Sequence, residues 1–294
     1  MQVLNMGSIN IDHVYEVDHF VRPGETLDSL SYRTFAGGKG FNQSIALARA
    51  GVTVLHAGKI GQDASWLRQR LMDEGVDTRF VVQDAMSTGH AVIQVVPDGE
   101  NAIFLFAGAN KCIMETELAA ALAACAPGDY LLLQNETNSV ALAMQKAQSL
   151  GLRIVFNPAP MSAEVQQYPL EQVDIFVLNE SEAEALTGKT NLLDVVETMR
   201  QRFPKAATVL TQGHGGAIFF DAHTLRHEAA LTVVPIDTTA AGDTFIGYFL
   251  AELISCGNPA RALAKGCRAA AICVTRAGAA DSIPLQHEIE NYRS

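Results

Sequence analysis

The strongest constraint on the fold is a regular alternation of short apolar runs and helical patterns between residues 129 and 212. The apolar runs are DYLLLQ, RIVFN, DIFVLN and TVLTQ, and helical spacing marks residues 140–150 and 182–187. Strands that alternate with helices favour a parallel sheet with helices on both faces. Runs that are apolar throughout fit strands buried on both faces. We therefore expect an α/β fold around a mostly parallel sheet.

The first 110 residues predict further elements of the same body and a small β insertion. The body elements are a strand over 1–9, a helix over 38–50, a strand over 52–58 and a helix over 64–74. The insertion comes from two segments, about 12–35 and about 89–107, which contain β-like runs around Arg22-Pro23-Gly24 and Pro97-Asp98-Gly99. No linker or repeat divides the chain, so we expect a single domain over 1–294.

Charge and composition argue against several classes of protein. The 294 residues contain 21 Lys and Arg against 32 Asp and Glu, a net charge of −11, whereas nucleic-acid binding needs basic patches. No apolar run reaches about 18 residues, so we expect no membrane span. The five cysteines form no CxxC pair, and the start MQVLNMGSINID has no signal-peptide pattern. These features predict a cytoplasmic protein with free thiols.

The segment DTTAAGDTF, residues 237–245, carries the clearest local signal. The apolar run FIGYFLAELI overlaps its end, so Ala240, Ala241, Gly242 and Asp243 mark the entry to a helix. The N–H groups at a helix entry lack partners and the helix dipole is positive there. Small residues would let an anion approach, and Gly242 is expected to allow unusual dihedral angles. A carboxylate beside a phosphoryl donor can accept a proton from an attacking hydroxyl. The alternative is an N-cap Asp among small packing residues.

A second glycine-rich helix entry is AGGKGFNQS, residues 36–44. Three glycines, Gly37, Gly38 and Gly40, would let bare backbone approach a small polar ligand, which Lys39 and Asn42 could bind. A glycine-rich turn without a ligand is the alternative. The segment is not a Walker A loop, because that motif requires GxxxxGK[ST].

Polar residues follow two of the expected strands. Asn10 and Asp12 could hold hydroxyl groups of a ligand, with an Asx turn as the alternative. Asn179 and Glu182 would face the same cleft as Asp243, since ligands bind beyond the carboxyl ends of parallel strands. Glu182 could hold Mg²⁺ through water, and a helix-capping arrangement is the alternative. Together these features suit phosphoryl transfer to a hydroxylated small molecule.

These motifs are similar to those of the ribokinase family, also called the PfkB carbohydrate kinases. The two family signatures correspond to FAGGKGFNQS and DTTAAGDTF, and the resemblance extends over essentially the whole chain. Shorter segments also resemble ribokinases, namely MGSINID (6–12), PGET (23–26), AGAN (107–110), NPAP (157–160) and NESE (179–182).

The resemblance implies a ribokinase-like fold with a β-sheet lid, and ATP-dependent phosphoryl transfer to a sugar hydroxyl. D-ribose, giving ribose 5-phosphate, is the first expectation; another sugar, a sugar phosphate or a nucleoside is the near alternative. A sugar- or nucleotide-binding protein without turnover is a different class. A nicotinamide oxidoreductase is a third, disfavoured because the chain lacks GxGxxG after a strand. The lid is also expected to be able to form a homodimer interface.

The resemblance further implies roles for individual residues. Asp243 corresponds to the catalytic base and Ala240, Ala241 and Gly242 to the anion hole. The positions that match sugar contacts are Asn10, Asp12, Gly38, Lys39, Asn42 and Glu136. The positions that match nucleotide contacts are Asn179, Thr211, Gly213, Gly215, Gly216 and Gly242, with Glu182 near Mg²⁺. The positions that match ligands of a K⁺ ion are Asp237, Thr239, Cys273, Arg276, Gly278 and Ser282.

The chain departs from the family pattern at Phe41, at Cys267 and around Glu136 in the stretch 134–137. Phe41 stands where these kinases usually have a small residue, next to Asn42. A side chain directed into the pocket would shrink the pocket, whereas one directed into the core would have no bearing on specificity.

Overall fold

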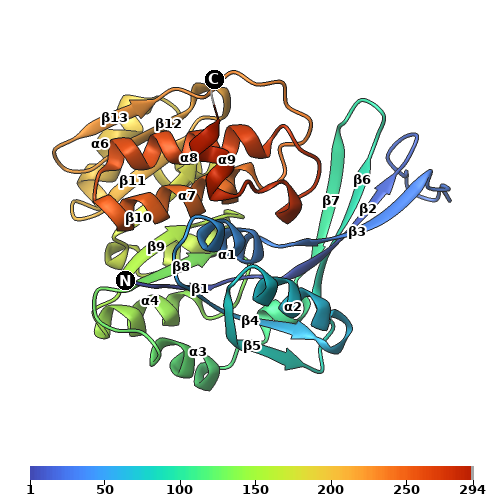
Figure 1. Cartoon of the computed structure of the whole chain (residues 1–294), viewed down its shortest axis with the longest axis horizontal. Coiled ribbons are helices and arrows are strands. Elements are labelled where there is room, and N and C mark those ends of the chain that lie inside the picture. The colour runs from blue at the N-terminus through green and yellow to red at the C-terminus, as the bar shows by residue number, and fades with distance from the viewer. Residues whose placement is uncertain (293–294) are drawn as a thin grey trace.

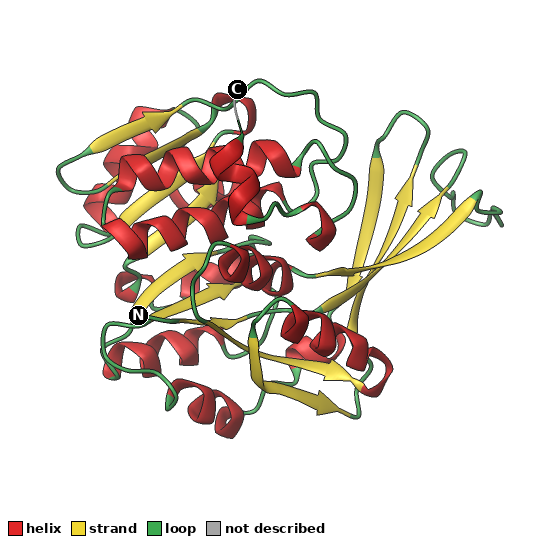
Figure 2. Cartoon of the chain, viewed as in Figure 1, coloured by secondary structure: helices red, strands yellow, loops and turns green. Residues whose placement is uncertain are grey.

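The computed structural model describes residues 1–292, and a nine-stranded sheet forms its centre (Figures 1 and 2). In spatial order the strands are β13 (Leu225–Glu228), β12 (Ala217–Phe220), β11 (Ala207–Thr211), β10 (Ile175–Asn179), β9 (Arg153–Asn157), β8 (Tyr130–Gln134), β1 (Val3–Met6), β4 (Val54–Gly61) and β5 (Asp77–Asp84). The pairs β11–β12 and β12–β13 are antiparallel, and the other neighbours are parallel. The expected mostly parallel sheet is confirmed.

Helices cover both faces of this sheet, because successive strand residues point to opposite sides. Val3 and Leu132 face one hydrophobic cluster, and their neighbours Leu4 and Leu133 face the other. The first cluster includes α1 (Lys39–Arg49), α2 (Ser65–Asp73), α7 (Ala241–Cys256), α8 (Pro259–Cys273) and α9 (Gln286–Asn291). The second includes α3 (Glu115–Leu122), α4 (Val140–Ser149), α5 (Glu180–Thr187) and α6 (Leu192–Arg202). The layered core is therefore what the wholly apolar strands predict.

A separate four-stranded sheet, hereafter the small sheet, projects from the α/β body (Figure 1). Its order is β3 (Ser31–Gly37), β2 (Asn10–Glu16), β6 (Gly89–Val95) and β7 (Asn101–Phe106). The strands come from the two segments that the sequence singles out, and β6 and β7 flank the turn at Pro97-Asp98-Gly99. The central pair β2–β6 is parallel and the outer pairs are antiparallel.

Several elements differ from the sequence-based expectation. The strand expected over 1–9 ends at Met6, and Asn10 and Asp12 lie within β2 rather than in an Asx turn. The edge strand β5 has no continuous apolar run, since polar residues interrupt the sequence DTRFVVQD. The strands β12 and β13 have four residues each, too few to show a period. The signal of β5 is weak because part of this edge strand faces solvent, and that of β12 and β13 is weak because of their length.

Among residues 1–292, we find no helix that combines the length and the apolar character needed to traverse a bilayer.

Candidate active site

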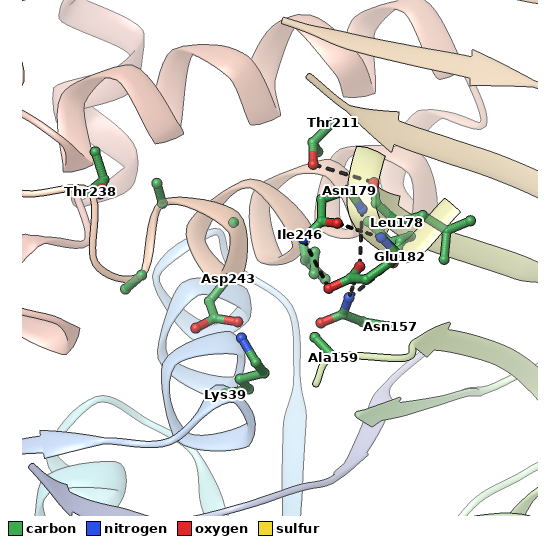
Figure 3. A pocket seen from close by; sticks show the side chains of 14 residues that line it. Lys39, Asn157, Ala159, Leu178, Asn179, Glu182, Thr211, Thr238, Asp243 and Ile246 are labelled. Atoms are coloured by element: carbon green, nitrogen blue, oxygen red, sulfur yellow. Dashed lines mark hydrogen bonds between the residues drawn. The ribbon is translucent and has the colours of Figure 1, made fainter. Parts of the chain in front are cut away.

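A cavity of about 210 Å³ lies where parallel strands β9, β10 and β11 end and helix α7 begins (Figure 3). Its lining includes the last residues of the three strands, Asn157, Asn179 and Thr211. Lys39 from α1 and Asp243 from α7 lie on its other side. The cavity therefore occupies the position at which open α/β sheets bind ligands.

The start of helix α7 forms one wall of this cavity, through Ala240, Ala241 and Gly242. The left-handed residue is Ala240, with φ 60°, and not Gly242, which has no positive φ. The expectation of unusual dihedral angles at Gly242 is thus wrong. A Cβ at Gly242 would meet no atom within 4 Å, so glycine leaves open space there. The absence of a side chain at Gly242 leaves room for an atom to approach the backbone, and Ala240 makes the turn into the helix.

Unused backbone donors mark this helix entry. The N–H of Ala241 bonds to the carbonyl of Thr238 (3.3 Å), and the intrahelical ladder begins with the N–H of Thr244 bonding to Ala240 (2.8 Å). Between them, the N–H groups of Gly242 and Asp243 have no acceptor within residues 1–292. Free N–H groups at the positive end of a helix dipole form an anion site.

Asp243 lies in the first turn of α7 and is buried. The side-chain amides of two consecutive residues of α1 bind its carboxylate. Asn42 donates from Nδ2 to Oδ2 (3.0 Å), and Gln43 donates from Nε2 to Oδ1 (2.8 Å). The alternative of a plain N-cap is excluded, because Ala240 occupies the N-cap position and has no side-chain cap bond.

Burial and the charge of Lys39 shift the pKa of Asp243 in opposite directions. Burial raises the pKa of Asp243 above its usual value, while the charge of Lys39 and the two amide hydrogen bonds lower it. The pKa of Lys39 is raised, chiefly by the charge of Asp243 and further by those of Glu136 and Glu182. Lys39 thus remains a cation among three acids, and Figure 3 shows it directed toward Asp243.

Asn179 and Glu182 form a capping box at the start of α5 and also line the cavity. Glu182 accepts hydrogen bonds from the backbone N (3.0 Å) and Nδ2 (3.0 Å) of Asn179, and from Nδ2 of Asn157 (3.4 Å). Burial raises the pKa of Glu182. The capping and ligand-facing interpretations therefore both apply to this pair. Since both carboxylate oxygens already have donors, contact with Mg²⁺ through water fits better than a direct ligand.

The residues expected to contact a sugar lie beside Asp243 and Lys39, at the base of the small sheet. Asn10 in β2 accepts a hydrogen bond from Nδ2 of Asn110 (2.7 Å). Asp12 lies two residues further along β2, against Gly37, where a Cβ would come within 2.0 Å of Asp12 Oδ2. The pKa of Asp12 is raised to about 7 by burial and by the charges of Glu136 and Asp243.

The glycine-rich entry to α1 joins this group. Gly38 precedes the helix with φ 94°, a conformation that favours glycine. Glu136 accepts hydrogen bonds from Ser8 Oγ and from the backbone N of Lys39 (3.0 Å), and burial raises its pKa. The oxygen Oδ1 of Asn42 is buried without a partner in residues 1–292, so the site retains an unused acceptor for a ligand hydroxyl.

The structure separates these expected sugar residues from the cavity itself. Only Lys39 and Asp243 of that set line the cavity, whereas the others lie outside its wall, namely Asn10, Asp12, Gly38, Asn42 and Glu136. They connect to it through the hydrogen bonds from Asn42 to Asp243 and from Lys39 to Glu136. The lining of the cavity and the expected sugar residues thus meet at Asp243 and Lys39.

Of the expected nucleotide loop, Thr211 lines the cavity, and Gly213, Gly215 and Gly216 do not. Gly213 and Gly215 form a 3₁₀ turn after β11. Gly216 has φ 91°, and a Cβ there would come within 2.0 Å of the carbonyl oxygen of Glu228 in β13. The structure therefore gives Gly216 a packing role in addition to any contact with a ligand.

The residues expected around K⁺ gather behind the α7 entry. Asp237 accepts hydrogen bonds from the backbone N of Thr239 (2.8 Å) and of Gly278 (2.9 Å). Cys273 lies 3.7 Å from the carbonyl of Thr239 and 3.0 Å from the hydroxyl of Ser282. The side chain of Arg276 donates to Glu288 (2.6 Å) and contains no oxygen, so only the backbone carbonyl of Arg276 could be a ligand. Oxygen donors of this kind suit a hard cation.

The described residues 1–292 contain no group of three or more His, Cys, Asp or Glu side chains placed to hold a metal ion.

Phe41 has no exposed surface and belongs to the hydrophobic cluster on the α1 face of the sheet. Its side chain is therefore a core residue and does not narrow the pocket. The sequence-based prediction missed Asn157, Thr238 and Gln43 as site residues. Asn157 ends β9 as Asn179 ends β10, so the strand-end rule already applied to Asn179 could have identified it.

Residues 2–286 match the model of the pfkB family carbohydrate kinases. This chain belongs to the PfkB carbohydrate kinase family. Its resemblance to that family is thereby confirmed over nearly the whole sequence, and the chain is an ATP-dependent carbohydrate kinase with the expected ribokinase-like α/β fold.

Individual PfkB kinases are similar over their full length. A ribokinase of Haemophilus influenzae is 39% identical over 299 residues, covering 96% of this chain and 95% of the relative. The crystal structure of a Cryptococcus neoformans ribokinase in complex with ADP is 33% identical, with a TM-score of 0.85 and 98% coverage of both chains. The structure of an Arabidopsis thaliana ribokinase with ribose and ATP is 25% identical, with a TM-score of 0.89 and coverage of 98% and 97%.

Proposed function

We propose that this kinase transfers the γ-phosphoryl group of ATP to D-ribose and produces ribose 5-phosphate. The observation that carries the proposal is the placement of Asp243. Its carboxylate is buried, two amides orient it, and it lies where the free N–H groups of α7 meet the subsite of Asn42 and Asp12. The relatives reported above include ribokinases, one of them with ribose and ATP bound.

In the proposed reaction, Asp243 accepts the proton of the attacking sugar hydroxyl, and the sugar oxygen forms a bond to the γ-phosphorus. The bond between that phosphorus and the oxygen bridging it to the β-phosphate breaks, and ADP leaves. The N–H groups of Gly242 and Asp243 would stabilise charge on the transferred phosphoryl oxygens. Lys39 would offset negative charge where the expected sugar residues meet the cavity, and the small sheet, acting as a lid, would exclude water.

Charge in the sugar subsite favours a neutral sugar over a sugar phosphate. Asp12 lies within the electrostatic influence of Glu136 and Asp243, and the charge of Lys39 acts on the latter two acids. A second phosphate group would meet net negative charge in a buried setting, where like charges repel strongly. Hydroxyl groups would instead find acceptors at Asp12, at Glu136 and at the unused Oδ1 of Asn42.

Two cations are part of the proposal. Mg²⁺ would supply charge neutralisation at the ATP phosphates, with Glu182 reaching it through water. A monovalent cation such as K⁺ would be held by oxygen atoms of Asp237, Thr239, Cys273, Arg276, Gly278 and Ser282. Its proposed effect is to fix the shape of the loop that leads into α7. Among the nucleotide contacts we include Asn179, Thr211, Gly213, Gly215 and Gly216.

We also propose that the small sheet forms a homodimer interface. Edge strand β7 is exposed along its whole length, and four consecutive apolar residues are uncovered: Ile103 (53%), Phe104 (62%), Leu105 (53%) and Phe106 (44%). An apolar strand with an open edge is prone to pair with another chain. A second copy would cover both the edge and the apolar side chains.

The decisive experiment measures ADP release with Mg-ATP and K⁺ across pentoses, hexoses, sugar phosphates and nucleosides, with the variant Asp243→Asn as the blank. We expect release with ribose in the wild type and none above background in the blank. Release with a different sugar would keep the chemistry and change the substrate. No ADP release with any acceptor would instead indicate a binding protein without turnover.

A further inference from the structure

A chain of buried polar side chains runs from the site into the core. Its members are Asp243, Gln43, Gln134, Asn5, Ser44 and His56, and all but Asp243 have at most 1% of their surface exposed. Buried polar groups are stabilised by hydrogen bonds to one another because water cannot reach them, and of these six side chains only Gln134 has an atom, Oε1, that is buried without a partner in residues 1–292. The direction of each hydrogen bond in such a chain is therefore fixed by its neighbours.

His56, at the end of the chain farthest from Asp243, determines which groups donate and which accept. Burial lowers its pKa to about 4, so the ring is neutral near pH 7 and carries one N–H. Nε2 lies 3.2 Å from the carbonyl oxygen of Gly7, which only accepts, so the hydrogen is on Nε2. Nδ1 therefore accepts from the hydroxyl of Ser44, at 2.8 Å. The hydroxyl oxygen of Ser44 is then free to accept from the next residue.

The hydroxyl of Ser44 in turn fixes which atoms of the Asn5 and Gln134 amides donate and which accept. Asn5 Nδ2 donates to Ser44 Oγ (2.8 Å) and to the carbonyl of Gly40 (2.8 Å), which leaves Asn5 Oδ1 as an acceptor. Gln134 Nε2 donates to that oxygen (2.9 Å) and to Gln43 Oε1 (2.7 Å). The reverse orientation of Gln134 would place its oxygen against two acceptors.

The orientation of the Gln134 amide fixes that of the Gln43 amide, which contacts Asp243. Because its oxygen accepts from Gln134, its amide nitrogen must face Asp243 Oδ1 (2.8 Å) and Asn157 Oδ1 (3.4 Å). Asn157 in turn donates to Glu182 (3.4 Å). One fully buried amide thus links the carboxylate of Asp243 to the strand-end residues around the phosphate side of the cavity.

We propose that Gln43 is a positioning residue for Asp243: its amide, oriented by the chain from His56, donates to the carboxylate and keeps it ionised in a single rotamer. This inference rests on the proposed phosphoryl transfer, in which Asp243 must be ionised to accept a proton. Gln43 itself has no role in binding sugar or ATP. Its loss should therefore change the protonation of the base more than the affinity for either substrate.

The test compares pH profiles of kcat/KM for ribose, followed by ADP release. Gln43→Glu keeps the shape but replaces the donor with a second carboxyl beside Asp243, so the two would share a proton. We expect the acidic limb of the profile to shift to higher pH by about one unit. At a given pH on that limb, kcat/KM would then be about tenfold lower than in wild type. The loss should shrink at higher pH, and KM for ATP should stay within about twofold of wild type.

Two further variants make the result specific. Gln69→Glu is the matched control, because Gln69 also donates to a carboxylate, that of Asp73 (2.8 Å), on the exposed face of α2. Its profile should equal that of wild type. Gln43→Met removes both donors without adding charge and should move the limb in the same direction by less.

Several outcomes would overturn the inference. A loss of activity that is uniform across pH, with an unmoved limb, would leave Gln43 with a purely structural role. Unchanged activity in Gln43→Met would exclude any role. If Gln43→Glu does not fold, judged by its thermal unfolding, Gln43→Met decides, and Gln134→Met decides if neither folds. Absence of sugar-dependent turnover in wild type would reject the proposed function and this inference together, whereas wild-type turnover with unmoved variant limbs rejects the inference alone.

Discussion

Asp243 is the residue on which the proposed chemistry depends most directly. Replacing it with Asn keeps its volume and removes the proton acceptor, while the free N–H groups at the start of α7 remain. We expect Asp243→Asn to lower kcat by about 10²–10⁴-fold and to leave ATP binding within a few-fold of wild type. ADP release and calorimetric titration with ATP measure the two effects. Full turnover in this variant would remove Asp243 as the base.

Asp12, proposed to contact the sugar, should lower the stability of the folded protein near neutral pH. Its pKa is about 7 in the folded protein against 3.8 for an ordinary Asp, so the folded state binds more protons than the unfolded state between these values. The free energy of unfolding should therefore fall as pH rises from about 4 to 7 and level off above that. Asp12→Asn removes this dependence and should stabilise the protein by about 1–3 kcal/mol at pH 8.

Thermal unfolding of wild type and Asp12→Asn between pH 4 and pH 8 measures this effect. The advantage of the variant should be small at pH 4 and largest at pH 8, together with a raised KM for ribose, since an acceptor is lost. A gain that does not change with pH would show that the carboxylate is not destabilised by burial.

At the scale of single elements, the two glycine-rich helix entries should respond oppositely to alanine. A Cβ at Gly242 would meet open space, so Gly242→Ala should unfold like wild type and yet lose about 100-fold or more in kcat, since the phosphate site narrows. A Cβ at Gly40 would lie 2.4 Å from the Cα of Gly7, so Gly40→Ala should lose about 1–3 kcal/mol of stability.

Melting curves and ADP release, measured on the same preparations, separate these two cases. Instability of Gly242→Ala would mean that the start of α7 is tightly packed. Retained activity in that variant would mean that phosphate does not approach Gly242.

The loop before α7 gives a prediction about cations. Its Asp237 bonds to the backbone of Thr239 and Gly278, so the loop and the turn after α8 are already tied together. We expect faster turnover with K⁺ than with tetramethylammonium at equal ionic strength. Asp237→Ala should abolish the difference. Equal rates with both cations in wild type would reject the proposed cation site.

At the scale of the whole molecule, the open small sheet predicts the oligomeric state. Ile103 and Phe104 are adjacent in β7 and point to opposite faces, so the double change to Lys places charge on both. We expect wild type to sediment as a dimer and the double variant as a monomer. Leu193→Lys is the control, because Leu193 is 70% exposed on α6, outside the small sheet.

A wild-type protein that sediments as a monomer at tens of micromolar would reject this interface. Dissociation of the control variant would place the interface on the α6 face instead.

The layered α/β body follows from local sequence patterns, since wholly apolar strands must be buried on both faces. The strand-end rule and the helix-entry pattern also placed Asn179, Glu182 and Asp243 in one cleft, and the structure brings all three to the same cavity. These features are local: each depends on the period or end of one element. The polar edge strand β5 and the four-residue strands β12 and β13 escaped prediction, because a partly exposed polar strand or a strand of four residues carries little periodic signal.

The contacts by which the residues of the site support one another depend on tertiary packing. Gln43 and Asp243 are 200 residues apart, and they meet because α1 packs against α7. The same packing directs Phe41 into the core while its neighbour Asn42 reaches the carboxylate. Side chains one residue apart on a helix point about 100° apart. Which of them faces a ligand is therefore settled by the neighbouring helix, which no local pattern in the sequence describes.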